Sequence, residues 1–232
     1  MVTQFLDESV ISTDAGNGWV SAYRAIGGKI KQFGMPHARA RVTGVNLDAD
    51  ILGGAQQIAQ YADFRNQRYG YGDSLWDVTD APIDTHQNTE RRYGSEMHIF
   101  FMLVSVASLG VKSGAELTLI VPAPPGLIST VAKPMKKAIL AGEAGDGSGV
   151  WSIALRDDKK PRIYTIKRVI TVPEGAGAYA AFQFTSEGET VRGGAADALA
   201  GKVTVLDLGA GTGDEYTLVN GNLAADAIGH AT

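Results

Sequence analysis

Short runs of apolar and β-branched residues occur near both ends of the chain, and the two patterns match. Val10 to Thr13 is followed by Asp14 and a Gly-Asn-Gly turn, and Val203 to Leu206 is followed by Asp207 and a Gly-Ala-Gly turn. The two aspartates are 193 positions apart. Each run predicts a buried strand that the aspartate ends, and each Gly-x-Gly predicts a tight turn whose backbone can approach a ligand closely.

A second turn signal lies 14 residues beyond each aspartate, at Gly27-Gly28 and at Asn220-Gly221. Both pairs suit a two-residue hairpin turn, because both central positions of that turn need positive φ. The chain therefore carries two strand-Asp-Gly-x-Gly-strand hairpins. Two carboxylates and two sets of turn amides indicate a site for a phosphate chain and its metal ion.

After the first hairpin, the hydrophobic periodicity continues for one strand and then weakens. A third strand is predicted from Lys29 to about Met35, where Pro36 breaks the run. From Arg39 to Glu90 the periodicity weakens, which predicts an irregular inserted subdomain with a short helix over Ala55 to Phe64. A long surface loop is the alternative, although one of this length is unusual in a compact domain.

The middle of the chain predicts a layered α/β arrangement. Ser95 to Leu109 reads as a helix that is apolar on nearly every face and ended by Gly110, so we expect it to be buried. A strand over 115–121 is stopped by prolines, and a helical segment then runs to about Leu140, with Pro134 either kinking or starting it.

Two more strands and a helix precede the second hairpin. The strands are predicted over Val150 to Leu155 and Arg162 to Val172. Small residues from Pro173 to Phe182 would let a helix pack tightly on the sheet, and Ser186 to Gly201 predicts a connection or short helix. The fold class is therefore α/β, with mixed sheets and flanking helices.

Composition excludes several classes of protein. The 232 residues contain no cysteine, which excludes disulfides and thiolate zinc sites and fits a reducing cytoplasm. The net charge of −4 and the absence of a large basic cluster argue against direct nucleic-acid binding. The longest apolar run, Met97 to Val111, is too short to span a bilayer, and the N-terminus does not resemble a secretory signal, so no membrane partner is expected. The spacing of the four histidines does not match that of metal ligands, which favours solvated or packing roles for them. They are His37, His86, His98 and His230.

Taken together, these segments resemble the actin-like ATPases, and most closely the plasmid-segregation actins of the ParM type. Asp14-x-Gly16-Asn17-Gly18 is similar to the first phosphate loop of the family, and the segment from Asp207 to Asp214 is similar to the second. Arg92-Tyr93-Gly94-Ser95 before an apolar helix resembles a segment common in that branch. The segment from Val172 to Ala178 resembles the connecting motif that carries the acidic residue positioning the attacking water.

The resemblance implies an actin-like, ribonuclease H-like fold that binds ATP or ADP with magnesium (Mg²⁺). It implies a first domain over 1–199, with a small subdomain inserted at about 36–90, and the start of a second domain over 200–232. Asp14 and Asp207 would hold Mg²⁺, and Glu174 would orient or deprotonate the water. The phosphate-binding residues would be Gly16, Asn17, Gly18, Gly209, Ala210, Gly211 and Thr212. The implied partners are further copies of the chain in a cytoplasmic filament that segregates plasmid or other DNA, and a DNA-binding adaptor protein.

Two departures from the family pattern matter. The basic residue often found seven positions after the first aspartate is Ser21 here, which argues against a β-phosphate contact from that position. The glycine-rich adenosine loop is missing, so we expect a truncated or naturally short chain. Residues 1–232 alone would then bind ATP weakly and associate through an open sheet edge.

Other interpretations of the same residues stay open. Val205 to Gly213 also resembles the nucleotide loop of S-adenosylmethionine-dependent methyltransferases, which requires a helix after the glycines. A sugar kinase or heat-shock chaperone would share both phosphate hairpins, and a non-catalytic actin-fold module would keep the fold without nucleotide binding. Structurally, both aspartates suit turn caps, and Glu174 suits a helix N-terminus.

Overall fold

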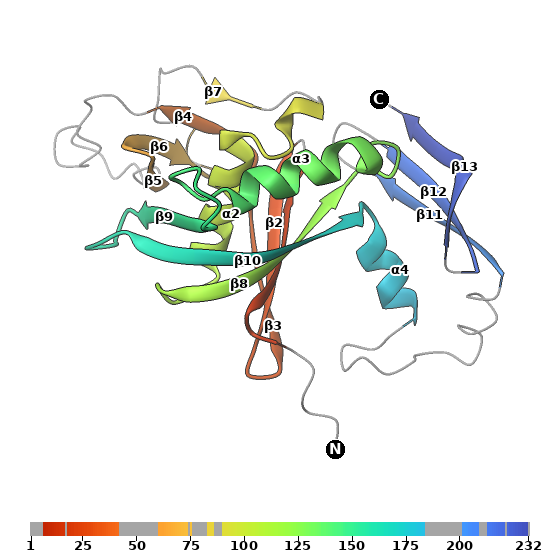
Figure 1. The fold of residues 1–232 in the computed structure, drawn as a ribbon, viewed down its shortest axis with the longest axis horizontal. Coiled ribbons are helices and arrows are strands. Elements are labelled where there is room, and N and C mark those ends of the chain that lie inside the picture. Colours follow the sequence, from red (N-terminus) through yellow and green to blue (C-terminus); the bar gives the residue numbers. More distant parts are fainter. Residues whose placement is uncertain are drawn as a thin grey trace.

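Two β-sheets and four helical segments make up the described part of the molecule (Figure 1). The computed structural model describes residues 7–16, 18–41, 60–73, 75, 83–85, 90–183, 201–208, 213–220 and 222–231. Within these residues, the strands form one ten-stranded and one three-stranded sheet. None of the helices in these ranges is long and apolar enough to cross a membrane.

A three-strand meander begins the large sheet. It consists of β1 (Val10–Ala15), β2 (Trp19–Ile26) and β3 (Lys29–Pro36), each antiparallel to the next. Gly27 and Gly28 join β2 to β3 at φ values of 55° and 76°, which confirms the predicted turn. Side chains of β1 alternate between the core and the opposite face, as expected for a strand covered mainly on one side.

The centre of the large sheet is partly parallel. β1 lies parallel to β8 (Ala115–Ala123), and β8 lies parallel to β10 (Arg162–Pro173), which pairs antiparallel with β9 (Val150–Leu155). The strand predicted to stop at Pro122 runs to Ala123, because β8 stays paired with β10 to its end. By that point the pairing of β8 with β1 has ended, at Ile120, and proline is tolerated where a ladder bond is not required.

Two helices of similar length bury different amounts of surface. Helix α2 (Glu96–Ser108) is buried at every position from Met97 to Ala107, which confirms the expectation for this all-apolar segment. Ser95 caps its N-terminus, and Gly110 ends it at a φ of 77°. In contrast, α3 (Ile128–Leu140) buries only one face. Pro134 lies within this helix. The buried face consists of Val131, Met135 and Ile139.

The segment predicted to be irregular contains regular strands wherever it is described. These are β4 (Arg39–Arg41), β5 (Gln60–Phe64), β6 (Gln67–Tyr71) and β7 (Ile83–Asp84), followed by the 3-10 helix η2 (Glu90–Arg92). The helix predicted over 55–64 is wrong at 60–64, because β5 pairs with both β6 and β9 and buries Ala62 and Phe64. Residues 55–59 lie outside the described ranges. The complete strand order is β3-β2-β1-β8-β10-β9-β5-β6-β4-β7.

The second sheet follows helix α4 (Ala176–Gln183), and residues 184–200 lie outside the described ranges. It contains β11 (Lys202–Leu208), β12 (Gly213–Val219) and β13 (Asn222–Ala231), all antiparallel. Asn220 adopts a φ of 50°, as the predicted hairpin turn requires, and Gly221 is outside the described residues. Because 213–219 is a strand, the helix that a methyltransferase loop needs at this place is absent from the described residues.

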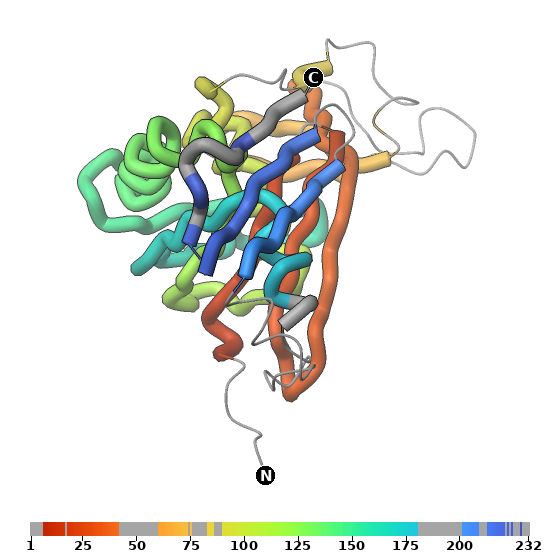
Figure 2. Tube along the Cα trace, turned by 90° about the vertical axis from the view of Figure 1, so that its right-hand side faces the viewer, coloured from red at the N-terminus to blue at the C-terminus, as the bar shows by residue number. Residues whose placement is uncertain are grey.

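The second sheet lies beside the first, in front of the β1–β3 meander when viewed as in Figure 2. Two glycines mark where the parts touch. A Cβ added to Gly175 would lie 2.9 Å from Val205 Cγ1 and 3.4 Å from Asp207 Cβ, and one added to Gly126 would lie 3.5 Å from Ile228. The second hairpin therefore packs against the end of β10, where α4 begins (Figure 1).

Candidate functional site

Asp14 lies near the end of β1, on the face opposite the core. The alternation of β1 buries Ile11, Thr13 and Ala15 and places Asp14 on the other face, where it is partly buried. Its partner across the ladder is Ser21 on β2. Ser21, which replaces the basic residue often found at this position in the family, therefore lies directly beside Asp14.

The first glycine turn is braced by a histidine. The backbone N–H of His37 donates to Gly18 O at 3.1 Å, and its ring nitrogen Nδ1 contacts the carbonyl oxygen of Gly16. His37 is buried, and its ring packs edge-on against Phe101. The packing role expected for His37 therefore includes holding the turn. Asn17 lies outside the described residues.

Glu174 follows the last residue of β10. Its backbone N–H donates to Ala123 O at 2.9 Å, at the end of β8, and Gly175 then turns the chain into α4 at a φ of 79°. The Glu174 side chain is 14% exposed, and its Oε1 lies 3.6 Å from Arg92 Nη2. The hydroxyl of Tyr93 donates to the same Oε1 at 3.2 Å.

The second hairpin contributes a pair of facing carboxylates. Asp207 on β11 lies directly opposite Asp214 on β12. Asp207 is partly exposed, whereas Asp214 is buried. The turn between them, with Gly209, Ala210, Gly211 and Thr212, lies outside the described residues.

The acidic groups of the two hairpins interact electrostatically. Burial raises the pKa of Asp14 from 3.8 to about 6; Arg92 opposes this rise, and the charge of Asp207 adds to it. Burial likewise raises the pKa of Glu174 to about 7, with contributions from Asp14 and Asp214 that Arg92 partly offsets. The fold thus brings acids of both hairpins close to one another, and the buried guanidinium of Arg92 lies near Asp14 and Glu174.

This donor set suits only one kind of metal site. Within the described ranges, no group of three or more His, Cys, Asp or Glu side chains is close enough to hold an ion alone. Mg²⁺ commonly keeps several waters and is bound by one or two carboxylates together with substrate phosphates. The mutual repulsion of Asp14 and Asp207, which a cation would relieve, fits that mode and does not fit an all-protein cage.

Sequence reasoning gave no role to three members of this cluster: Arg92, Tyr93 and Asp214. In the sequence, Arg92 and Tyr93 belong to a motif and Asp214 ends the second phosphate segment, and neither position indicates a role beside Glu174. A usable signal was present for Asp214, which follows a glycine turn just as Asp207 precedes it. For Arg92 no local signal exists, because its neighbour Glu174 is 82 positions away in the chain.

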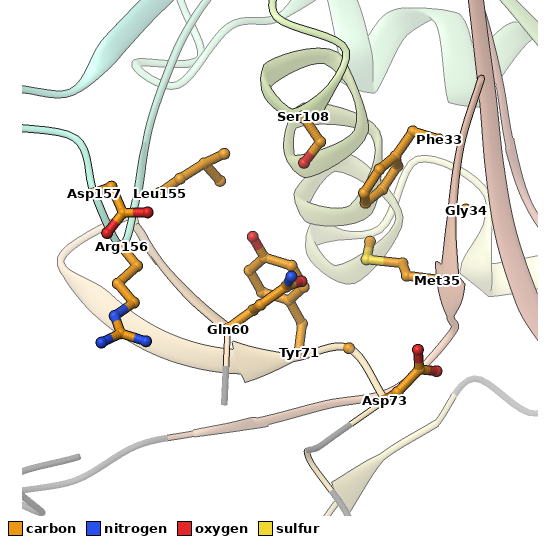
Figure 3. Close-up of a pocket in the computed structure, with 11 residues that line it drawn as sticks. Phe33, Gly34, Met35, Gln60, Tyr71, Asp73, Ser108, Leu155, Arg156 and Asp157 are labelled. Carbon is orange, nitrogen blue, oxygen red and sulfur yellow. The ribbon is translucent and has the colours of Figure 1, made fainter. Parts of the chain in front are cut away.

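A cavity of about 760 Å³ lies outside this cluster (Figure 3). Its wall includes Phe33 and Met35 from β3, Tyr71 from β6, Ser108 from α2 and Asp157 after β9. None of Asp14, Glu174 or Asp207 lines it. The carboxylate cluster and the cavity are therefore separate features.

No protein-family model matches the chain, and no curated protein matches it in sequence. Solved structures do match it. The archaeal actin homologue Ta0583 aligns with a TM-score of 0.69 and 16% identity over 96% of this chain and 61% of its own. The ParM protein of pSK41 aligns at 0.67 and 18%, over 95% and 65%. The filament structure of AlfA from B. subtilis plasmid pLS32 aligns at 0.66 and 15%, over 96% and 71%.

These likenesses show that the chain has an actin-like fold, as the sequence motifs predicted. The chain spans about three fifths of the length of the first of these structures. One Ta0583 structure is a complex with ADP, and one AlfA filament is bound to AMPPNP. The inserted subdomain at about 36–90 and the boundary at 199/200 stay predictions.

Proposed function

We propose that the whole protein is an actin-like ATPase that forms nucleotide-dependent filaments. The observation that supports this most is the meeting of the two matched hairpins, whose aspartates, Asp14 and Asp207, influence each other across the junction of the two sheets. Glu174 lies near Asp14 and near Asp214 of the second hairpin, at the point where β10 passes into α4. Nucleotides bound to Ta0583 and AlfA are consistent with this proposal.

In this proposal the protein contributes positioning and electrostatics. Backbone amides of the two glycine turns hold the β- and γ-phosphates, with Gly16, Asn17 and Gly18 in the first turn and Gly209 to Thr212 in the second. Asp14 and Asp207 would hold Mg²⁺. The ion, when bound, neutralises charge on the phosphate oxygens.

Glu174 is the residue we assign to the water. Its carboxylate orients a water molecule and accepts a proton as the water oxygen bonds to the γ-phosphorus. The bond from the γ-phosphorus to the bridging oxygen breaks, and that oxygen leaves with ADP. The pKa of about 7 puts this group near the range in which a general base works best at neutral pH.

Filament formation is the part of the proposal that rests on the relatives. AlfA is described as a filament, and head-to-tail contact between identical chains is what an open filament requires. We extend this to a cytoplasmic filament that moves plasmid or other DNA, joined to that DNA by an adaptor protein. We also propose the division into a first domain over 1–199, with its insertion, and a second domain beginning at 200.

The test is phosphate release combined with sedimentation in Mg²⁺ and ATP. An ATPase that forms filaments should release phosphate and pellet only with nucleotide. Turnover without pelleting would favour a kinase-like member of the fold. Calorimetry that detects no binding of Mg²⁺-ATP would instead favour a non-catalytic module with this fold.

A further inference from the structure

Two residues in the segment before helix α2, Arg92 and Tyr93, contact each other and the proposed catalytic glutamate. Arg92 Nη2 donates to the Tyr93 hydroxyl at 2.6 Å, and that hydroxyl donates to Glu174 Oε1 at 3.2 Å. Arg92 Nη2 also lies 3.6 Å from the same oxygen. The Arg92 side chain is 3% exposed, so water screens the attraction between Arg92 and Glu174 only weakly. Both contacts converge on a single carboxylate oxygen.

The backbone around this pair has little freedom to move. Gly94 adopts a φ of 78°, and a Cβ there would lie 3.0 Å from Met135 Cα and Ala138 Cβ of α3. Ser95 accepts a hydrogen bond from the N–H of His98 and caps α2. One glycine packed on α3 and one cap on α2 thus fix the segment that carries Arg92 and Tyr93.

The surroundings explain why Glu174 needs such support. Asp14 on β1 and Asp214 on β12 are acidic neighbours of Glu174, and both repel its charged form. Ser21, opposite Asp14 in the ladder, supplies no charge to balance them. A glutamate with three rotatable bonds would turn away from these neighbours unless a donor and a cation held it.

We propose that Arg92 and Tyr93 are positioning residues that hold Glu174 Oε1 and thereby present Oε2 to the attacking water. This rests on the proposed ATPase activity, because it assigns a role within that site. The two residues act through Glu174 and do not touch the phosphates in this assignment. Their loss should lower turnover far more than nucleotide affinity.

The molecule offers a matched control for Tyr93. Tyr69 is also 8% exposed, and its hydroxyl also donates to a glutamate oxygen, Oε1 of Glu96, at 3.1 Å. In steady-state phosphate release by the whole protein, Tyr93→Phe should lower kcat roughly tenfold, the value of one good hydrogen bond, and leave KM within about twofold. Tyr69→Phe should change neither. Arg92→Met should lower kcat further, and Arg92→Lys should restore part of it.

Equal kcat values for Tyr93→Phe and the wild type would overturn the positioning role, and so would equal losses in Tyr93→Phe and Tyr69→Phe. A wild-type protein that releases no phosphate would refute the ATPase proposal instead. The contact itself is then tested by thermal unfolding of Tyr93→Phe, Glu174→Ala and the double variant. If Tyr93 holds Glu174, Tyr93→Phe should change Tm less in the Glu174→Ala background than in the wild type, whereas equal changes in both backgrounds would show that the residues do not act as a unit.

Discussion

The two hairpins share a sequence pattern but differ in what they are built into. The first belongs to the ten-stranded sheet, where Ile11, Val20 and Ala22 are fully buried in the main core. The second belongs to a three-stranded sheet with a small cluster made by Val205, Tyr216 and Leu218. Leu206 and Leu208 of that hairpin are 61% and 75% exposed.

The two aspartates share a sequence motif but differ in the structure that surrounds them. Asp14 is held by a strand with neighbours on both sides, by a braced turn and by α2 behind the sheet. Asp207 depends on one three-stranded sheet and on its contact with Gly175. Regions with few buried apolar contacts open at lower free energy. We therefore expect the first hairpin to be the fixed half of the site and the second to be the half that moves.

The largest effect should come from the residue between the two halves. Glu174→Ala should slow ATP hydrolysis by the whole protein by roughly 10²- to 10⁴-fold, with nucleotide affinity nearly unchanged. Asp207→Ala should instead weaken the binding of Mg²⁺-ATP. Glu116→Ala, which removes an exposed acid on β8, serves as the control and should alter neither. Unchanged turnover in Glu174→Ala would remove this residue from the mechanism.

Core truncation should affect the two regions unequally. Phe100 is fully buried in the large cluster, so Phe100→Ala should cost about 3 to 5 kcal/mol of unfolding free energy. Tyr216→Ala should mainly open its own sheet. Amide hydrogen exchange measures this directly: protection should fall throughout in Phe100→Ala, but chiefly in β11–β13 in Tyr216→Ala. Equal loss everywhere in both variants would mean that the two sheets unfold as one unit.

Stability without metal should depend on pH through the first aspartate. Its pKa rises on folding from 3.8 to about 6, so the folded state binds more protons across this window and the free energy of unfolding falls as pH rises. For this pKa shift, ionisation of Asp14 lowers the free energy of unfolding by roughly 3 kcal/mol. Glu174 acts in the same direction up to about pH 7.

Asp14→Asn should therefore flatten the pH dependence of urea-induced unfolding between about pH 4 and about pH 6, and it should make the apoprotein more stable at neutral pH. Comparison with the wild type cancels the contributions of the exposed acids. If the free energy of unfolding depended on pH in the same way in both proteins, burial would not raise the pKa of Asp14.

The smallest effect should come from the contact between the halves. Gly175→Ala places a methyl group against Val205 at a φ of 79°, whereas Gly145→Ala has a similar φ of 74° and nothing within 4 Å. The backbone cost of roughly 1 to 2 kcal/mol applies to both variants, so their difference isolates the contact. We expect Gly175→Ala to be the less stable of the two and to lower turnover. Identical behaviour would place the second hairpin farther from Gly175.

Local pattern predicted most of the framework, because strand alternation and turn glycines are local signals. Val150 to Leu155, the Gly27-Gly28 turn and the buried Ser95 to Leu109 helix all follow from residues close in sequence. The segment 60–64 is a strand where a helix is predicted, because β5 pairs with β6 across a turn at Arg65 and Asn66 and with β9, about 90 positions later.

The candidate site divides in the same way. Asp14, Asp207 and Glu174 stand next to turn or helix signals and could be picked out. Arg92 could not be assigned, because its meaning depends on a contact between η2 and the end of β10. His37 is similar, since its role comes from the turn that folds back onto it.

The most direct test of a shared site uses Mn²⁺ in place of Mg²⁺. Paramagnetic Mn²⁺ with ATP broadens the NMR signals of nearby amides in the whole protein, independently of turnover. If both hairpins hold one metal-nucleotide complex, the amides of Ser21, opposite Asp14, and of Asp214, opposite Asp207, should broaden together, while Gly145 stays sharp. Broadening at one hairpin only, or at neither, would contradict a site built from both.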